Sequence, residues 1–396
     1  MKFLEQIQKY TPMEWKSLGE VTNYKRSNKY LVKSTNYKDY FPIPVLTAGK
    51  TFILGYTNET TGVYKASENP VIIFDDFTTD NKWVDFDFKA KSVVMKMIIS
   101  KDETKVILKY IYYWLNTLPK ITDGDHKCRW ISNYFNKLIP IPPLKVQQEI
   151  VRILDTFTEL TAELTAQLTA ELTARKKQYA YYREQLLTFK EGEVEWKRLG
   201  ELFDLKKGYT PSKSNEGYWK DGTIPWFRME DIRKNGRVLN KSIQYVNSCA
   251  VKGGKLFPAN SIIVSTSATI GEHALITVPF LSNQRFVNLS LKSKYTDKFL
   301  IKFLFYYGFV LDEWCKNNTT VGKFAGVNMN GFKNFLIPIP PLEKQREIVR
   351  ILDKFDTLTT SISEGLPREI ELRKKQYVYY REQLLDFPGE EKEMNK

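Results

Sequence analysis

The sequence predicts an α+β protein in which two mixed α/β domains are joined by two long repeated helices. These helices are expected to form an antiparallel, coiled-coil-like pair with pseudo-twofold symmetry. Three observations predict this fold: a strong internal repeat, an apolar stripe at helical spacing inside each copy, and short strand patterns between the copies. The 396 residues, 42% of them hydrophobic, are enough to give two domains packed cores.

The internal repeat organises the whole chain. Residues 139–187 and 337–385 match at a constant offset of 198 residues, with 31 of 49 positions identical. Both copies begin with IPIPPL and end with RKKQY-x-YYREQLL, and a shorter repeat, EWK-x-LGE, starts at residues 14 and 195. The predicted divisions are an N-terminal segment (1–14), a first variable domain (15–138), a central repeated helix (139–195), a second variable domain (196–336) and a C-terminal repeated helix (337–396).

Each repeated segment predicts a long amphipathic helix. A Pro-Pro pair opens each copy, and apolar residues then recur every three or four positions, which marks one helix face. A stripe of about 40 residues exceeds what a small domain can cover, so a mutual helix pair is favoured over packing on the helix's own domain. The predicted interface residues of this pair are Leu154, Phe157, Leu160, Leu164, Leu168 and Leu172 in the first copy and Leu352, Phe355, Leu358, Ile362, Leu366 and Ile370 in the second.

The middles of the two copies differ. Residues 158–174 read TEL-TAEL-TAQL-TAEL-TA, a four-residue repeat. Each four-residue step turns a helix by about 400°, so the leucine stripe drifts by about 40° per step and suits a wrapped contact. The second copy has Gly365-Leu366-Pro367 at this place, and a proline inside a helix removes a hydrogen bond and clashes with the preceding turn. A kink or break is therefore expected there.

The variable domains read as mixed α/β structures that are diverged copies of one topology. Short apolar, β-branched runs bounded by turn residues predict strands, and one longer apolar run near the end of each domain predicts a helix. The predicted strands lie at residues 71–74, 92–99, 261–265 and 285–291, and the predicted helices at 105–116 and 296–314.

The positive charge is concentrated in the variable domains. The chain carries a formal net charge of +14. Residues 15–138 hold 19 basic and 13 acidic groups, residues 196–336 hold 21 and 10, and the rest of the chain sums to −3. An excess of this size points to polyanions as partners, and it places their contacts on the variable domains.

Several classes of function are disfavoured. No signal pattern and no run of eighteen apolar residues is present, so a cytoplasmic protein without membrane contact is expected. Cys128, Cys249 and Cys315 lack CxxC spacing, and His126 and His273 lack ligand or triad neighbours in the sequence, so no disulfide framework and no metal site is predicted. Without a GxxxxGK[ST] phosphate loop or a methyltransferase motif, no catalytic residue is assigned.

The IPIPPL…EIVRILD segments, the RKKQY-x-YYREQLL endings and the TAEL repeats together resemble the specificity subunit of Type I restriction-modification systems. The resemblance covers essentially the whole chain; only Gly365-Leu366-Pro367 departs from an unbroken second helix. It implies a non-catalytic subunit whose variable domains read a two-part site in double-stranded DNA. It also implies two adenine-N6 methyltransferase subunits and the motor and restriction subunits as partners. S-adenosylmethionine, ATP and Mg²⁺ would then be bound by those partners, and this chain would hold no cofactor.

Candidate DNA-contacting residues are Lys and Arg for phosphates, and Arg, Asn and Gln for base edges. For any one of them, a solvated surface charge is the competing interpretation. Arg228, beside an aromatic pair, is the strongest candidate for base reading. The candidates are Lys25, Arg26, Lys29, Thr78, Asn81 and Lys82 in the first variable domain and Lys206, Lys207, Lys213, Arg228, Asp231, Ser265, Thr266 and Gln284 in the second.

Two other functions remain open at this point. A freestanding sequence-specific DNA-binding protein would show the same basic domains but would need no enzymatic partner. A restriction or modification enzyme in its own right is disfavoured by the missing catalytic motifs. A methyltransferase that copurifies with the chain would exclude the freestanding DNA-binding protein. A methylation assay on the isolated chain tests whether the chain is itself an enzyme.

Overall fold

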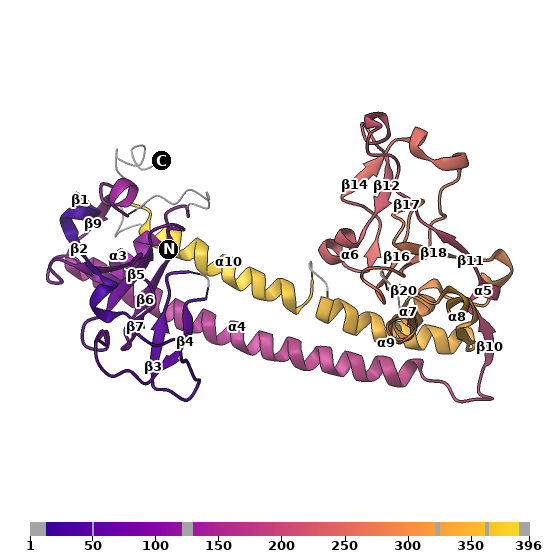
Figure 1. Cartoon of the computed structure of the whole chain (residues 1–396), viewed down its shortest axis with the longest axis horizontal. Coiled ribbons are helices and arrows are strands. Elements are labelled where there is room, and N and C mark those ends of the chain that lie inside the picture. Colours follow the sequence, from indigo (N-terminus) through magenta and orange to yellow (C-terminus); the bar gives the residue numbers. More distant parts are fainter. Residues whose placement is uncertain (1–12, 50, 121–129, 321–324, 361–363, 388–396) are drawn as a thin grey trace. The chain divides into compact units, whose positions relative to one another are not determined.

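The structure is a computed structural model that describes residues 13–49, 51–120, 130–320, 325–360 and 364–387. The chain divides into two compact units, residues 1–164 with 373–396 and residues 165–372. The division falls inside the long helix α4 (Leu144–Leu187) and inside α10 (Leu366–Leu385). Each unit therefore contains one variable domain and one stretch of each repeated segment (Figure 1).

The first variable domain is built on a four-stranded antiparallel sheet of order β2-β8-β5-β6. A second sheet has the order β4-β3-β7, and strands β1 and β9 pair at the point where the domain meets α4. The elements are β1 (Glu14–Ser17), α2 (Leu18–Val21), β2 (Thr22–Arg26), β3 (Ile43–Leu46), β4 (Ile53–Thr57), β5 (Val71–Asp75), β6 (Asn81–Val84), β7 (Lys89–Ala90), β8 (Met95–Ser100), α3 (Leu108–Leu115) and β9 (Leu138–Ile141).

The second variable domain has a five-stranded sheet of order β11-β18-β15-β16-β13 and a smaller sheet of order β14-β12-β17. Its elements are β10 (Glu195–Arg198), α5 (Leu199–Leu202), β11 (Phe203–Lys207), β12 (Ile224–Phe227), α6 (Met229–Asn235), β13 (Val238–Leu239), β14 (Gln244–Val246), β15 (Ser261–Ser265), β16 (His273–Ile276), β17 (Leu281–Ser282), β18 (Phe286–Leu291), α7 (Ile301–Asn317), β19 (Thr319–Thr320), β20 (Gly326–Val327), α8 (Met329–Asn334) and β21 (Leu336–Ile339).

The two domains share one topology, as the sequence predicts. The orders β2-β8-β5-β6 and β11-β18-β15-β16 correspond strand for strand. In each small sheet the central strand pairs antiparallel with one neighbour and parallel with the other. Helices α3 and α7 follow the last strand of the main sheet in each domain, and their apolar side chains share a core with that sheet. The α+β fold class is therefore confirmed.

The predicted strands are found within one residue, except that β8 begins at Met95 rather than at residue 92. Both predicted helices begin later than expected, α3 at Leu108 and α7 at Ile301. The cause is a tertiary contact. The side-chain oxygens of Gln147 and Gln345, at the start of each repeated helix, accept the backbone N–H groups of Ile107 and Leu300 at 3.0 and 2.8 Å. Those two residues are held extended, so each helix begins after them.

The repeated helices pair antiparallel within each unit. In the first unit, the Phe157 and Tyr380 rings lie 5.6 Å apart, and the Thr158 and Tyr377 hydroxyls lie 3.0 Å apart. Residue numbers therefore increase along α4 in the direction in which they decrease along α10. In the second unit, Phe355 of α9 (Leu342–Thr360) stacks with Tyr182 at 5.3 Å. This pair and Phe157–Tyr380 occupy the same positions of the repeat. The antiparallel pair is thus confirmed.

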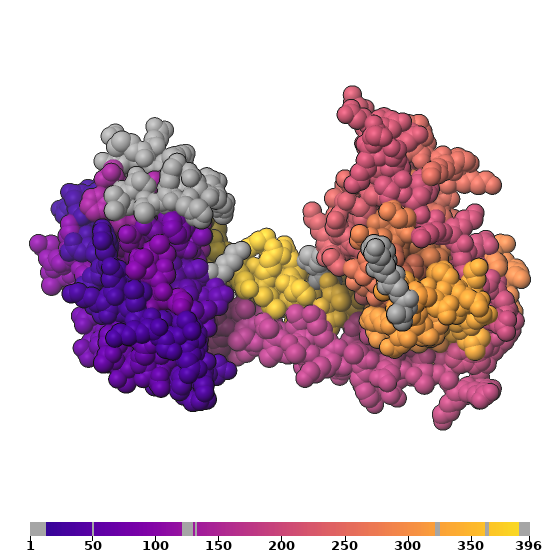
Figure 2. Space-filling view, viewed as in Figure 1, coloured from indigo at the N-terminus to yellow at the C-terminus, as the bar shows by residue number. Residues whose placement is uncertain are grey.

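The apolar stripe does not serve the helix pair alone. Leu154 and Leu352 are fully buried in clusters that contain the cores of their own variable domains. In the space-filling view, the last turns of α4 lie against the second variable domain (Figure 2). The stripe therefore packs on the variable domain near the ends of the helices and on the other helix further along. This corrects the prediction that favoured the helix pair over packing on the domain.

The remaining predicted pair residues differ in exposure. Leu168 and Leu366 are buried, whereas Leu160 is 55% exposed and lines a groove of 170 Å³ between α4 and α10 together with Phe157 and Leu164. Leu160 is thus at the surface, which corrects its assignment to a packed seam. Leu172, Leu358 and Ile370 are half-buried, and Ile362 lies outside the described residues.

The predicted break in the second helix is present. Helix α9 ends at Thr360, and α10 begins at Leu366 with Pro367 in its first turn, where a proline costs no hydrogen bond. A Cβ atom on Gly365 would lie 2.5 Å from the carbonyl oxygen of Thr357, so the chain passes too close for any other residue. Gly365 and Pro367 together explain why the second copy forms two helices.

The two copies of the repeat differ at Asp356, and this difference predicts that a variant at this position changes the stability of the protein. Burial raises the pKa of Asp356, and the position equivalent to Asp356 in the first copy is the neutral Thr158. A carboxyl with a raised folded pKa opposes folding above that pKa. Asp356→Thr should therefore raise the free energy of unfolding at pH 7.5.

This gain should shrink as the pH falls toward the ordinary pKa of aspartate, because the wild-type carboxyl then becomes protonated in the folded state. Urea denaturation at pH 7.5 and pH 4.5 provides the measurement. The reciprocal variant, Thr158→Asp, is the matched control and should be destabilised at pH 7.5. Equal gains for Asp356→Thr at both pH values would contradict the explanation.

Candidate nucleic-acid interface

The basic residues predicted in the first variable domain gather at one end of its main sheet, here called the loop end. The register aligns Arg26, Lys96, Phe74 and Asn81 in one row across the four strands. Lys25 and Arg26 therefore finish β2 beside the turn between β5 and β6 that carries Thr78. The pairing of the strands thus brings residues 25–26 and 78–82 to the same edge.

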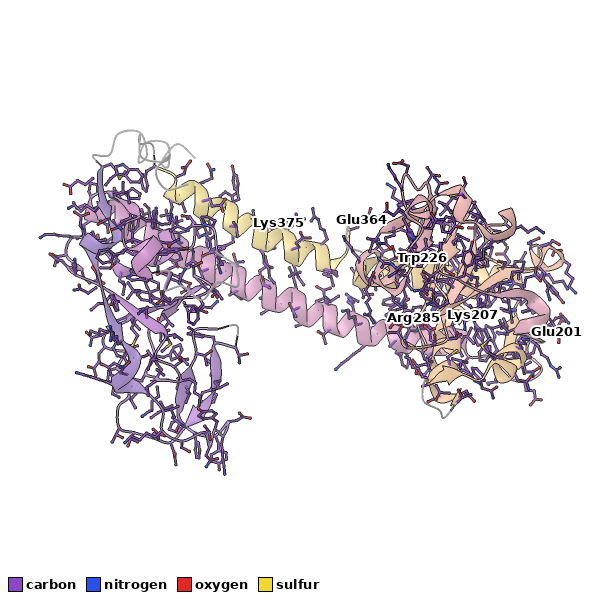
Figure 3. The ribbon with its side chains drawn as sticks, turned by 45° about the horizontal axis from the view of Figure 1, so that its top comes forward. Glu201, Lys207, Trp226, Arg285, Glu364 and Lys375 are labelled. Atoms are coloured by element: carbon purple, nitrogen blue, oxygen red, sulfur yellow. The ribbon has the colours of Figure 1, made fainter. Side chains whose placement is uncertain are left out.

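The second variable domain repeats this arrangement. Lys207, Val287, Val264 and His273 form the corresponding row. Lys206 and Lys207 occupy the same positions at the end of β11 as Lys25 and Arg26 at the end of β2, and all four are exposed. Lys207 lies near Arg285, which directly precedes β18, while Glu201 lies away from both (Figure 3).

Arg228 joins the same loop end through the small sheet. The N–H of Asn283 donates to the carbonyl of Phe227 at 3.1 Å, which holds Arg228 beside the loop that contains Gln284. The guanidinium of Arg228 lies 5.5 Å above the ring of Trp226 and pairs with Glu230 at 2.7 Å. Its Nε, which is buried, has no hydrogen-bond partner among the described residues. Arg228 is therefore half-buried and oriented by an aromatic face.

A close approach of the backbone sets this geometry. The N–H of Tyr209 donates to the carbonyl of Ser282 at 2.8 Å, so the chain leaving β11 runs against the loop between β17 and β18. A Cβ atom on Gly208 would lie 2.2 Å from the carbonyl oxygen of Asn283. Only glycine fits here, and its presence keeps Lys207, Gln284 and Arg228 at one edge.

Four of the predicted contact residues are buried and serve as the frame of the loop end instead. Asn81 accepts a hydrogen bond from Asn116 at 2.9 Å. Asp231 accepts the N–H groups of Arg228 and Ile243, and burial raises its pKa. Ser265 is the last residue of β15 and Thr266 follows it, and their backbone N–H groups donate to the carbonyls of Glu272 and Arg285. Their side chains shape the turns, which corrects their assignment as surface contacts.

The turns at the loop end carry backbone strain at matching places. Thr79 in the β5–β6 turn and Ala268 in the β15–β16 turn have φ values of 60° and 65°, a backbone conformation that non-glycine residues rarely adopt. In the first turn, Asp75 accepts the Thr78 hydroxyl at 2.8 Å and the Phe77 N–H at 2.9 Å. These side-chain bonds hold the turn and present Thr78 at the surface.

Lys29 lies in a short 3₁₀ helix (Ser27–Tyr30), and Lys33 and Lys213 lie in the loops that lead to the small sheets. In the first domain, the buried ammonium of Lys89 pairs with Glu59 at 2.9 Å. The carboxylate of Glu59 also accepts the backbone N–H groups of Lys33 and Ser34 at 3.0 and 2.7 Å. Burial alone would raise the pKa of Glu59, but these contacts outweigh it and lower that pKa. A buried ion pair therefore fixes the loop that follows Lys29.

Sequence reasoning missed residues that the fold brings to the loop end. Lys96 lies near the start of β8, and Lys120 pairs with Asp80 beside Lys82. The hairpin of β19 and β20 is bridged to the β15–β16 turn through Ser267 and Gly326. Only strand pairing across long sequence separations brings these residues to the loop end.

The structure also pairs a histidine with a carboxylate that is distant in sequence. His273 Nδ1 lies 2.7 Å from Asp312, and Arg237 lies 3.2 Å from the same carboxylate oxygen. His273 is fully buried, and a Cβ atom on Gly308 would lie 2.8 Å from its Nε2, so no substrate can reach the ring. The three residues tie β16 to α7.

Other chemistry is scarce in the described part of the chain. Cys315 is buried and Cys249 is exposed, and burial raises the pKa of the Cys315 thiol to about 12. Cys128 and His126 lie outside the described residues. Residues 13–49, 51–120, 130–320, 325–360 and 364–387 contain no group of three His, Cys, Asp or Glu side chains that could hold a metal ion. Within the same ranges, no helix is both long enough and apolar enough to cross a membrane.

Solved structures with low sequence identity share this fold. A chain from a study of complex assembly and conformational transition of the type I R-M system has 19% identity and a TM-score of 0.66, over 95% of this chain and 98% of that one. The HsdS subunit from Thermoanaerobacter tengcongensis also has 19% identity, with a TM-score of 0.51 over 96% and 98% of the two chains.

Relatives with higher identity identify the family. The EcoR124I/EcoR124II specificity subunit of Escherichia coli is 52% identical over 99% of this chain and 98% of the relative. The EcoprrI specificity subunit, also of Escherichia coli, is 61% identical over 51% of this chain and 52% of its own length. The family model described as the Type I restriction modification DNA specificity domain matches residues 11–174 and 191–372. The resemblance inferred from the repeats is thus confirmed, and the chain belongs to the family of Type I restriction-modification DNA specificity subunits.

Proposed function

We propose that each variable domain reads one half of a two-part double-stranded DNA site through its loop end. One observation carries this proposal: two domains of different sequence place a pair of exposed basic residues at the same strand end, Lys25-Arg26 and Lys206-Lys207. Cations at these positions would contact phosphates and fix the register on DNA. Neighbouring polar and guanidinium groups, Gln284 and Arg228 among them, would then read base edges in the major groove.

The chemistry is assigned to partner subunits. We infer that the chain is not itself an enzyme and binds no cofactor, and that it directs methyltransferase and restriction subunits to its site in the cytoplasm. S-adenosylmethionine, ATP and Mg²⁺ would be bound by those subunits. The RKKQY-x-YYREQLL segments are identical in both copies except at x, where Ala180 corresponds to Val378, whereas the middles of the helices differ at many positions. Two surfaces of nearly the same sequence match two copies of one partner, which supports the presence of two methyltransferase subunits.

Salt dependence tests the phosphate contacts. The full-length chain should bind duplex DNA with a log–log slope against salt of about −4 or steeper, because each phosphate contact contributes about −0.9. Lys206→Ala with Lys207→Ala should make the slope shallower by about 2. Lys294→Ala, beyond the opposite end of β18, is the matched control and should leave the slope unchanged. Equal slopes for the wild type and the double variant would remove these lysines from the interface.

Mapping of N6-methyladenine in cells that carry the complete system tests the function itself. The expected result is one motif made of two defined halves with an unspecified spacer between them. A chain that binds DNA but supports no methylation with its methyltransferase would instead be a freestanding DNA-binding protein. Methylation by the isolated chain would overturn the assignment of catalysis to the partners.

A further inference from the structure

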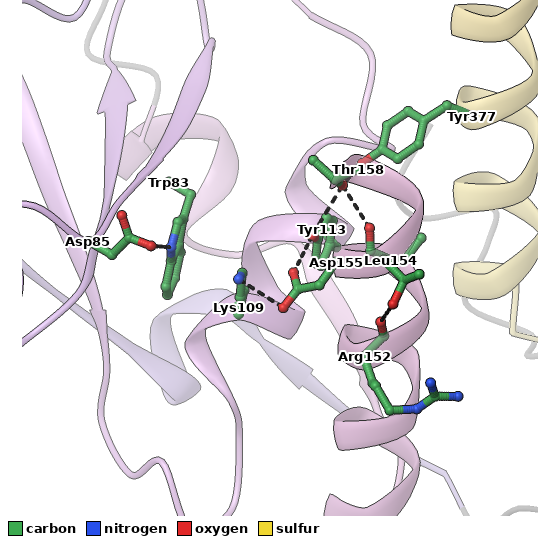
Figure 4. Close-up of polar contacts among 10 residues, drawn as sticks. Trp83, Asp85, Lys109, Tyr113, Arg152, Leu154, Asp155, Thr158 and Tyr377 are labelled. Atoms are coloured by element: carbon green, nitrogen blue, oxygen red, sulfur yellow. Dashed lines mark hydrogen bonds and ion pairs between the residues drawn. The ribbon is translucent and has the colours of Figure 1, made fainter. Parts of the chain in front are cut away.

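Each variable domain is joined to its repeated helix by a partly buried polar contact of the same composition. In the first unit, the carboxylate of Asp155 on α4 accepts the hydroxyl of Tyr113 at 2.5 Å and the ammonium of Lys109 at 2.9 Å, both from α3 (Figure 4). In the second unit, Asp353 on α9 accepts the hydroxyl of Tyr306 at 2.6 Å and the ammonium of Lys302 at 2.8 Å, both from α7. We call these two contacts the clasps.

The clasps have the same composition although the two variable domains differ along most of their sequences. The variable domains differ in sequence, yet α3 and α7 each carry Lys and Tyr four residues apart on the face that meets the carboxylate. Burial, and then the neighbouring aspartate, raises the pKa values of Tyr113 and Tyr306, so both hydroxyls stay protonated as donors. Two divergent domains have thus kept one set of donors for one repeated acceptor.

A second attachment point lies two helical turns away. Gln147 and Gln345 are fully buried, and each side chain bonds three backbone groups. In the first unit these groups are the N–H of Ile107 and the carbonyls of Lys105 and Pro142. Gln147 and Asp155 are separated by about 12 Å along the helix at 1.5 Å per residue. Apolar contacts in the shared core already hold α3 against α4, and two directional polar attachments at this separation fix the angle between the helices.

We propose that Asp155 and Asp353 are positioning residues that set the angle at which each variable domain is held on its helix, and thereby the spacing accepted between the two DNA half-sites. The inference rests on the proposed function. A five-residue strand spans about 17 Å, so a tilt of about 10° displaces its far end by about 3 Å. That displacement is close to the rise of one base pair, about 3.4 Å. A loosened clasp should therefore relax the spacing by about one base pair while the bases read stay the same.

The test uses Asp155→Ala in the complete methyltransferase complex, with N6-methyladenine mapped across a genome. Methylation at sites whose spacer is one base pair too short or too long should rise by about tenfold over the wild type, which is the effect of about 1.4 kcal/mol. Asp353→Ala should give the same relaxation through the other domain. Asp155→Glu, which keeps the acceptor, should restore most of the spacing preference.

Glu149→Ala is the matched control. Glu149 pairs with Arg152 at 2.6 Å at the surface of the same helix, so its loss should not change the spacing. A merely structural role of the clasp would lower methylation at all sites and leave one spacing, and that result would overturn the inference. A change in the half-site bases would overturn it too. The proposed function fails separately, if the wild-type complex methylates no two-part motif.

Discussion

Inserting one more Thr-Ala-Glu-Leu unit after Leu172 is expected to lengthen the spacer of the DNA site without changing either half-site. Helix α4 is continuous from Leu144 to Leu187, and the boundary between the two units, at Leu164 and Thr165, falls inside the repeat. Four added residues lengthen the helix by about 6 Å. Since B-DNA rises about 3.4 Å per base pair, the spacer should grow by at most about two base pairs.

The second repeated segment favours a gain of one base pair. This segment forms two helices, because α9 ends at Thr360 and α10 begins at Leu366. A change in the angle between the two helices can therefore absorb part of the added length. Methylation mapping of the insertion variant is the measurement, and Thr-Ala-Glu-Leu inserted after Leu187, where α4 has ended, is the control. An unchanged spacer would show that α4 does not set the distance. A changed half-site would show that the recognition residues lie elsewhere.

Arg228→Ala is expected to lower discrimination at one position of one half-site by about 1–3 kcal/mol, the usual effect of losing a bidentate contact to guanine. The fold should survive, because the hydrogen bonds at the start of α6 involve the backbone of Arg228 and not its side chain. The N–H of Arg228 donates to Asp231 at 2.7 Å, and the N–H of Asp231 donates to the carbonyl of Arg228 at 3.1 Å. Neither bond involves the guanidinium.

Two further variants separate base reading from charge. Arg228→Lys keeps the charge but loses the planar fork, so it should lose discrimination and keep the salt slope. Glu230→Gln removes the partner of Arg228 and should raise affinity for all sequences with unchanged discrimination. Competition binding with single-base substitutions in each half-site distinguishes these outcomes. Equal weakening on every sequence would make Arg228 a phosphate contact.

Much of the architecture could be predicted from the sequence because the signals are local or repeated. The two copies at residues 139–187 and 337–385 predict two equivalent helical segments, and helical spacing predicts their apolar faces. Gly365 and Pro367 predict the break through covalent geometry alone. The charge excess in the variable domains likewise depends only on composition. Each of these predictions needs no knowledge of contacts between distant residues.

The candidate site could be predicted less well. Lys25, Arg26, Lys206 and Lys207 were expected in basic loops, and the structure places them instead at the ends of β2 and β11, where they are exposed. Asn81, Asp231, Ser265 and Thr266 were misassigned because polar residues in turns look alike whether they face solvent or hold the backbone. Their burial depends on partners such as Asn116, Ile243 and Arg285, which are between 12 and 35 residues away.

By itself, the sequence determined the two-domain plan, the repeated helices and their break, and the basic character of the variable domains, since these follow from periodicity, composition and covalent geometry. Only the tertiary structure decided which residues meet. It placed Arg26 beside the β5–β6 turn through the strand register. It also brought His273 to Asp312 and Asp155 to Tyr113 through hydrogen bonds, and it divided the long helices between two units. The physical reason is that sheet register and side-chain burial depend on free energies summed over residues far apart in the chain, which no short window of sequence contains.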